Sequence, residues 1–339
     1  MPEVIEQRIS GLGADQHPAV DAWLTLNSGN RRPGSVASLY ASSLAGRKNR
    51  DRRKSSAYSL DSAGLGGGSV VAKLCDPKTA GIERNIYEHI LPQLPISSLH
   101  YYGHVETGGA HWLFLEHAGG VEWEIENRIH LELAIHWMAE MHGNSAHLDT
   151  LSLLPYRGPG YYLSQLTAAR QRMMGSVSNP ALTPANIGIL EEFITSSGLL
   201  EKHWEEIEAF CATMPETLVH NDFVSKNVHV RMKNSRPVLL AFDWEMSGRG
   251  VPAVDLYWFF QHAPDGYITR YWEHMRRFNT NIGLRDIEKL AILGAIFRIM
   301  DAVEWVSQYL LTDTPDRKIH HTRLHTDRLK HACHALGWS

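Results

Sequence analysis

The sequence contains few cysteines, no long apolar run and little net charge, and each absence excludes a class of protein. Its three cysteines, Cys75, Cys211 and Cys333, lie too far apart along the 339 residues to suggest a zinc site or a disulfide framework. The best apolar stretch, 291–297, is too short to cross a bilayer. A formal charge of −4 gives no general signal for binding nucleic acid or a membrane.

The composition is that of an ordinary globular protein. Hydrophobic residues make up 43% and charged residues 21% of the chain, and its length suffices for two compact units. The first ten residues lack the basic and apolar segments of a secretion signal, so we expect a cytoplasmic location with the cysteines as buried thiols. The 20 histidines show no metal-ligand spacing, and we expect those of the polar C-terminal stretch to be solvated: His320, His321 and His325. No feature indicates an oligomeric state.

Short apolar runs separated by turn residues predict a small antiparallel sheet in the first part of the chain. A short helix is expected at 19–26, and another at 82–91. The expected strands are 35–44, 56–60, 69–74, 98–105 and 110–116. After Gly119-Gly120 the pattern becomes helical, with helices expected at 131–141, 158–174, 186–210, 252–262, 268–278 and 285–311. This order predicts an α+β protein.

The most informative segment is Val219–Glu245, which reads VHNDFVSKNVHVRMKNSRPVLLAFDWE. Asp222 and Asn227 lie on one short loop, and the apolar run 237–242 then ends at Asp243. A carboxylate at the end of a strand, facing a loop carboxylate and an amide, can hold metal-bound phosphates. Phosphoryl transfer chiefly requires positioning, charge neutralisation and one group that orients the attacking hydroxyl.

The pattern His220-x-Asp222, then Asn227, then Asp243-Trp244-Glu245 resembles the aminoglycoside phosphotransferase and choline kinase-like family. The resemblance implies a protein kinase-like two-lobed fold, with a small antiparallel-sheet N-lobe and a larger, mainly helical C-lobe. It implies Asp222 as the catalytic base, and Asn227 and Asp243 as ligands of Mg²⁺. The N-terminal nucleotide-binding lobe would span 1–116, with 1–30 as an extension, and the C-terminal catalytic and substrate-binding lobe 117–339.

The same resemblance implies a lysine that reaches the α- and β-phosphates. Lys73 ends the apolar stretch 70–73 and matches this position. A glutamate on the following helix would fix its ammonium group. Glu83 is the best candidate for that glutamate, and Glu88 is the alternative.

The phosphate-covering loop of this fold would lie at 46–55, one strand before Lys73, rather than at the glycines 66–68. Arg47 and Ser55 are its candidate phosphate contacts, although a solvated basic loop explains the same composition. The backbone around Glu116 and Ala118 would bind the purine. Backbone recognition leaves no side-chain signature, so ATP is the default donor and GTP stays an alternative.

The short interval between Asp243 and Asp255 leaves no room for a peptide-holding activation segment, which indicates a small-molecule hydroxyl acceptor. We therefore expect an ATP-dependent small-molecule kinase, with an antibiotic or another natural product as a candidate acceptor. A metabolic kinase for choline, homoserine, thiamine or a sugar is an alternative, and a catalytically silent nucleotide-binding module is another. Asp301 and Glu304 share one helix face and are candidates for an acidic acceptor pocket. Lys226 would contact either the γ-phosphate or solvent.

Overall fold

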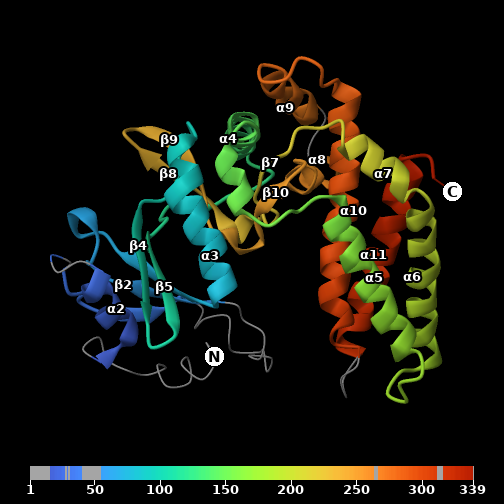
Figure 1. Cartoon of the computed structure of the whole chain (residues 1–339), viewed down its shortest axis with the longest axis horizontal. Coiled ribbons are helices and arrows are strands. Elements are labelled where there is room, and N and C mark those ends of the chain that lie inside the picture. Colours follow the sequence, from blue (N-terminus) through green and yellow to red (C-terminus); the bar gives the residue numbers. More distant parts are fainter. Residues whose placement is uncertain are drawn as a thin grey trace. The chain divides into compact units, whose positions relative to one another are not determined.

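The computed structural model describes residues 16–26, 29, 31–39, 55–262, 266–310 and 316–338, without the side chains of 55 and 316–318 (Figure 1). The chain divides into two compact units. The first draws on residues 1–133 and 222–246, and the second on 134–221 and 247–339. The segment that carries Asp222, Asn227 and Asp243 therefore belongs to the same unit as the N-terminal sheet. A lobe boundary at residue 116 stays a prediction.

A five-stranded antiparallel sheet forms the centre of the first unit, with the strand order β1-β2-β3-β5-β4. Its strands are β1 (Val36–Ser38), β2 (Ser55–Leu60), β3 (Val70–Cys75), β4 (Tyr101–Thr107) and β5 (Ala110–Glu116). All five occur where the sequence predicts strands. The phosphate-covering loop expected at 46–55 lies outside the described residues except for its last residue.

Alternation along β3 gives the sheet two different faces. Ala72 and Leu74 belong to the apolar cluster that Trp23 of α2 (Pro18–Leu26) enters from one side. Lys73 and Cys75 consequently face the other side, where Cys75 packs with Ala80 of α3 (Pro77–Asn85). Strand parity thus places the Lys73 side chain on the face that α3 covers.

Helix α3 begins where the sequence provides a strong N-terminal cap. The carboxylate of Asp76 accepts the backbone N–H groups of Lys78 and Thr79 at 2.9 and 3.1 Å, and Pro77 occupies the first helical position. The helix continues into a π-helical turn, Ile86–Ile90, and a 3₁₀ turn, Leu91–Gln93. This cap fixes the start of the helix that carries Glu83.

A three-stranded sheet of order β6-β8-β9 completes the first unit. It contains β6 (Val121–Glu122), β8 (Val228–Lys233) and β9 (Arg236–Ala241). Asn234 and Ser235 join β8 to β9 with φ angles of 50° and 62°, as a tight two-residue hairpin turn requires. Short 3₁₀ turns, Ser225–Asn227 and Trp244–Met246, flank this hairpin.

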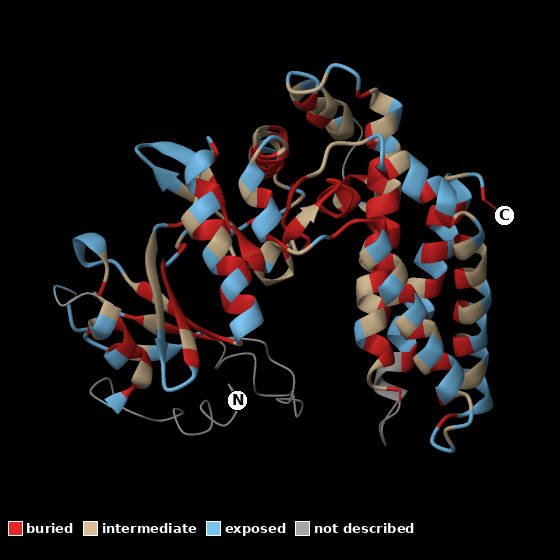
Figure 2. Cartoon of the chain, viewed as in Figure 1, coloured by how far each residue is buried: buried red, intermediate tan, exposed pale blue. Residues whose placement is uncertain are grey.

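Helices build the second unit, and α4 (Arg128–Ser145) runs from the first unit into it. The others are α5 (Pro159–Ser176), α6 (Pro184–Lys202), α7 (Trp204–Cys211), α8 (Tyr257–Gln261), α9 (Tyr267–Met275), α10 (Leu284–Ser307) and α11 (Asp316–Ala335). Strands β7 (Thr217–Val219) and β10 (Gly248–Gly250) pair antiparallel. Helix α10 packs against α5, α8 and α11 and is buried over much of its length (Figure 2).

Glycine is required at one point of α10 because the chain approaches it closely. A Cβ atom on Gly294 would lie 1.8 Å from the carbonyl oxygen of Ala253. The missing side chain lets α10 contact the 3₁₀ turn Val254–Leu256 directly. That turn carries Asp255.

Two expectations about the second unit are wrong in detail. The helix expected at 186–210 is two helices, because His203 adopts non-helical angles of φ −100° and ψ 12°. The polar C-terminal stretch forms α11, which buries Ile319, Leu329 and Ala332. His320 and His321 are exposed, as expected, whereas His325 is partly buried, and this burial lowers the pKa of its imidazole to about 4.

The expectation of buried thiols is confirmed, since Cys75, Cys211 and Cys333 are all buried and free. None of the helices in the described part of the chain is long and apolar enough to span a membrane.

Candidate active site

Lys73 lies between two carboxylates in the first unit. Its Nζ atom donates to Glu83, and it lies 2.5 Å from Oδ1 of Asp243. Lys73 is 5% exposed and Glu83 is fully buried. Glu88, the alternative partner, instead accepts from Arg84 and from the hydroxyl of Tyr101, both at 2.9 Å.

The electrostatics favour a permanently charged lysine. Burial alone would lower the pKa of Lys73, but the attraction of Glu83 and Asp243 outweighs it and holds that pKa well above its ordinary value. Burial raises the pKa of Glu83, against the opposing attraction of Lys73. The buried ammonium group is thus held between the carboxyl groups of Glu83 and Asp243.

The loop with Asp222 and Asn227 is held together by its own hydrogen bonds. Nδ2 of Asn227 donates to the backbone oxygen of Asp222 at 3.0 Å and to its Oδ2 at 2.9 Å. The N–H of Phe242 donates to the backbone oxygen of Asn227 at 3.0 Å, which ties the loop to the residue before Asp243. Lys226 lies 3.4 Å from Oδ2 of Asp222 and is 68% exposed.

Asp243 adopts an unusual backbone conformation, with a φ of 66°. Non-glycine residues seldom adopt this left-handed region, and those that do are concentrated at functional sites. The conformation follows directly on β9, whose buried end is Leu239–Ala241. The strand therefore delivers the Asp243 carboxylate to the Lys73 ammonium group.

The donor set at this point fits Mg²⁺ only in part. Lys73 contacts Oδ1 of Asp243, and Asn227 uses its Nδ2 toward Asp222, so Oδ2 of Asp243 and Oδ1 of Asn227 can each accept a metal. Within the described residues, no group of three His, Cys, Asp or Glu side chains could hold a metal alone. Two protein oxygens nevertheless suit Mg²⁺, which usually keeps several waters and binds substrate phosphates.

Asp255 fixes the two residues that precede Asp222 in the chain. Its carboxylate accepts the backbone N–H of His220 at 2.7 Å and that of Asn221 at 2.8 Å. His142 contacts the same carboxylate at 3.2 Å. Burial would raise the pKa of Asp255, but the contacts with His142 and His220 lower it overall, so the carboxylate stays ionised. Asp255 thus fixes the backbone directly before Asp222.

Two further residues of the second unit hold Asn221, and the sequence analysis missed both. Nη1 of Arg298 donates to its backbone oxygen at 3.0 Å, and the hydroxyl of Tyr162 lies 3.3 Å from its Oδ1. Asn221 itself has a φ of 62°. Arg298 interrupts the apolar run 295–300 of α10, and this lone cation was the only sequence signal.

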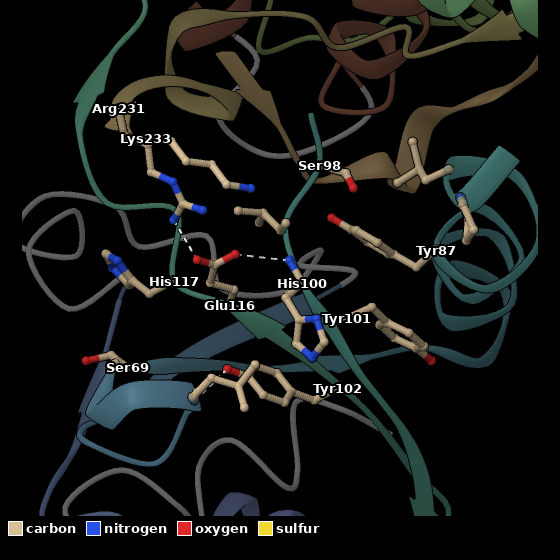
Figure 3. A pocket seen from close by; sticks show the side chains of 15 residues that line it. Ser69, Tyr87, Ser98, His100, Tyr101, Tyr102, Glu116, His117, Arg231 and Lys233 are labelled. Carbon is tan, nitrogen blue, oxygen red and sulfur yellow. Dashed lines mark hydrogen bonds and ion pairs between the residues drawn. The ribbon is translucent and has the colours of Figure 1, made fainter. Parts of the chain in front are cut away.

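The side chain of Glu116 is used within the protein. Its carboxylate accepts from Nη1 of Arg231 at 2.7 Å and from the N–H of His100 at 3.1 Å (Figure 3). Burial raises the pKa of Glu116, but these two hydrogen bonds lower it overall. The backbone oxygen of Ala118 accepts from Arg231 at 3.3 Å, whereas its N–H has no partner among the described residues.

The remaining candidates have mixed outcomes. Arg47 lies outside the described residues, and Ser55 is described only as the first residue of β2. Glu304 is occupied by Arg172 at 2.8 Å and by Gln308. Asp301 accepts the hydroxyl of Tyr161 at 3.0 Å through Oδ1. The roles of all these residues stay predictions.

Comparison with known proteins supplies the family. The model of the phosphotransferase enzyme family matches residues 45–283, more than half of the chain. No curated protein sequence matches it.

Three solved structures illustrate the shared protein kinase-like fold. A spectinomycin phosphotransferase in complex with ADP and spectinomycin has 10% identity and a TM-score of 0.59, covering 95% of this chain and 99% of that one. A choline kinase from Cryptosporidium parvum has 10% identity and a TM-score of 0.59, covering 94% of each chain. A macrolide 2′-phosphotransferase from Brachybacterium faecium has 12% identity and a TM-score of 0.54, covering 91% of this chain and 98% of that one. The chain belongs to the phosphotransferase enzyme family, as an ATP-dependent kinase that acts on hydroxyl groups of small molecules.

Proposed function

We propose that this kinase transfers the γ-phosphate of Mg²⁺-bound ATP to a hydroxyl group of a small molecule that also carries an amine. One observation supports the proposed catalytic residues. The first unit holds the Lys73–Glu83 and Lys73–Asp243 contacts together with the Asp222–Asn227 loop, and one backbone hydrogen bond, Phe242 to Asn227, joins the two groups.

Each side chain has one task in this proposal. Asp222 accepts or orients the proton of the attacking hydroxyl. Lys73, fixed by Glu83, contacts the phosphates of the nucleotide. Asn227 and Asp243 would hold Mg²⁺, and the ion would supply positive charge beside the phosphates of the nucleotide. Otherwise the protein needs only to position the nucleotide and the acceptor, because this reaction requires little covalent catalysis.

The backbone near Ala118 is the proposed contact for the purine. Its N–H has no partner among the described residues, although Ala118 is only 7% exposed. A backbone N–H that is removed from water costs free energy unless it has a hydrogen-bond partner. We infer that adenine does so, with GTP as the competing donor to be tested.

The environment of the Asp301 carboxylate favours an amine-bearing acceptor. Its Oδ2 atom is buried and has no hydrogen-bond partner among the described residues, while Oδ1 already accepts from Tyr161. Burial raises the pKa of Asp301 to about 6, against the attraction of Arg157 and Arg298, so the carboxylate is ionised at neutral pH. An ammonium group of the acceptor would satisfy it. Choline kinase, one of the similar structures, acts on an alcohol with a cationic nitrogen.

The test is ADP release from purified protein with ATP or GTP and a panel of hydroxyl compounds. The panel pairs amino alcohols and aminoglycosides with sugars and other uncharged polyols. We expect turnover with ATP and an amine-bearing compound, and none for Asp222→Asn, which keeps the size of the side chain. Nucleotide binding without turnover across the panel would instead identify a silent nucleotide-binding module.

Asp301→Asn tests the acceptor assignment separately from the catalytic one. Asparagine retains the hydrogen-bonding shape but not the charge, so the KM of the amine-bearing acceptor should rise while the KM of ATP stays constant. An unchanged acceptor KM would contradict the role of Asp301 and leave that of Asp222 intact.

The buried free cysteines suit a reducing compartment, from which we infer a cytoplasmic location.

A further inference from the structure

A cavity of about 770 Å³ lies in the first unit beside the carboxylate of Glu116, the last residue of β5 (Figure 3). The apolar and aromatic part of its lining, the apolar wall, includes Leu65, Leu91, Leu99 and Tyr102. The cationic side chains of Arg231 and Lys233 reach toward the cavity from β8. Its volume is within the usual range for sites that bind small molecules.

The cavity contains more positive than negative charge. Arg231 and Lys233 are two residues apart on β8, so alternation places both on the same face of the strand. Glu116 is the only acidic residue among those that line the cavity, and Arg231 already pairs with it at 2.7 Å. The exposed side chain of Lys233 has no ion pair or hydrogen bond with any described residue. A second anion is therefore the group that this site lacks.

We propose that this cavity binds a small aromatic carboxylate, whose charged group contacts Lys233 and Arg231 and whose ring lies on the apolar wall. The rings of His100 and Tyr102 form an edge-to-face pair with centroids 4.6 Å apart, which gives that wall a rigid aromatic surface. Leu65 is 71% exposed, so part of the wall is apolar surface that a ligand would cover.

The bound anion weakens nucleotide binding. This effect rests on the proposed role of the backbone at 116–118 in binding the purine. Arg231 contacts the carboxylate of Glu116 and the backbone oxygen of Ala118, and His229 contacts the backbone oxygen of Gly119 at 2.8 Å. An anion at Lys233 competes with Glu116 for Arg231 and so loosens the peptide that binds the purine. Because coupling is reciprocal, the nucleotide must weaken binding of the anion by the same factor.

The experiment compares 1-naphthoate with its neutral analogue 1-naphthamide by ligand-observed NMR on the full chain. The variant is Lys233→Ala, and the matched control is Arg236→Ala. Arg236 pairs with Lys233 across the hairpin and is also exposed, but it does not line the cavity. We expect naphthoate to bind the wild type and Arg236→Ala. Its affinity for Lys233→Ala should be about tenfold lower, as loss of one charge-assisted contact implies.

Three results would overturn the proposed site. They are equal affinity for naphthamide, an unchanged affinity in Lys233→Ala, and an equal loss in Arg236→Ala. The coupling is tested by titrating ADP with and without saturating naphthoate, where an unchanged ADP affinity contradicts it. Failure of ADP to bind even without naphthoate counts against the proposed nucleotide contacts, while the naphthoate titrations still decide the anion site.

Discussion

Replacing Arg298 by methionine tests whether its hydrogen bond to Asn221 fixes the backbone directly before Asp222. The Arg298 guanidinium donates to the backbone oxygen of Asn221 at 3.0 Å, directly before Asp222 in the chain. Methionine keeps the apolar part of the side chain but cannot donate. A hydrogen bond from a charged group contributes about 1.5–3 kcal/mol, and each 1.36 kcal/mol is about tenfold in rate. If the whole free energy of this hydrogen bond is lost from the transition state, kcat falls about 10- to 150-fold.

The assay is ADP release at saturating ATP and acceptor, with thermal unfolding as a parallel measurement. The KM of ATP should change by less than about twofold, because Lys73 and Glu83 belong to the first unit. Arg172→Met is the matched control. This arginine of α5 contacts Glu304 and Ser307 but not the loop, so its kcat should stay near that of the wild type. An Arg298→Met enzyme with normal kcat, or one whose ATP KM rises as much as kcat falls, contradicts the reasoning.

Three further perturbations give equally definite expectations. Glu83→Gln should raise the KM of ATP and lower the unfolding temperature, because breaking a buried ion pair costs about 3–5 kcal/mol and Asp243 offsets only part of that; unchanged values in both assays would exclude the pairing. Asp301→Asn should stabilise the fold by up to about 2–3 kcal/mol at pH 8. Because the pKa of Asp301 is raised to about 6, the wild-type fold loses stability as pH rises through that value. The stability advantage of Asp301→Asn should therefore disappear near pH 4 in thermal unfolding. Lys226→Ala should change kcat by less than about fivefold, since exposed ion pairs are weak; a loss of a hundredfold or more would indicate a γ-phosphate contact.

Local patterns in the sequence predicted an antiparallel sheet followed by helices, and the resemblance to a known family implied the two-lobed fold. Alternation and turn residues marked the five strands, and the spacing from Asp222 to Asn227 and on to Asp243 needed only a loop and one hairpin. The family resemblance implied a contact of Lys73 with Glu83 or Glu88, and this contact joins a strand to the next helix. Each of these features spans a short stretch of chain, where propensity and periodicity are informative.

Helix α11 was missed for a physical reason. Its sequence is polar, and it buries only a narrow stripe that includes Ile319 and Leu329. A narrow stripe gives weak periodicity, so the packing of α11 against α6 and α10 had to supply what the pattern did not. The break at His203 was likewise hidden, because the apolar residues continue on both sides of it.

The amino-acid sequence by itself indicated which residues to propose for phosphoryl transfer, since that proposal rests on residue type and short spacing. Only the tertiary structure decided what surrounds them. Asp255 and Arg298 reach His220 and Asn221 from helical segments far along the chain. Glu116 turns its carboxylate to Arg231. Such partners are chosen by packing between distant segments, which no local pattern encodes.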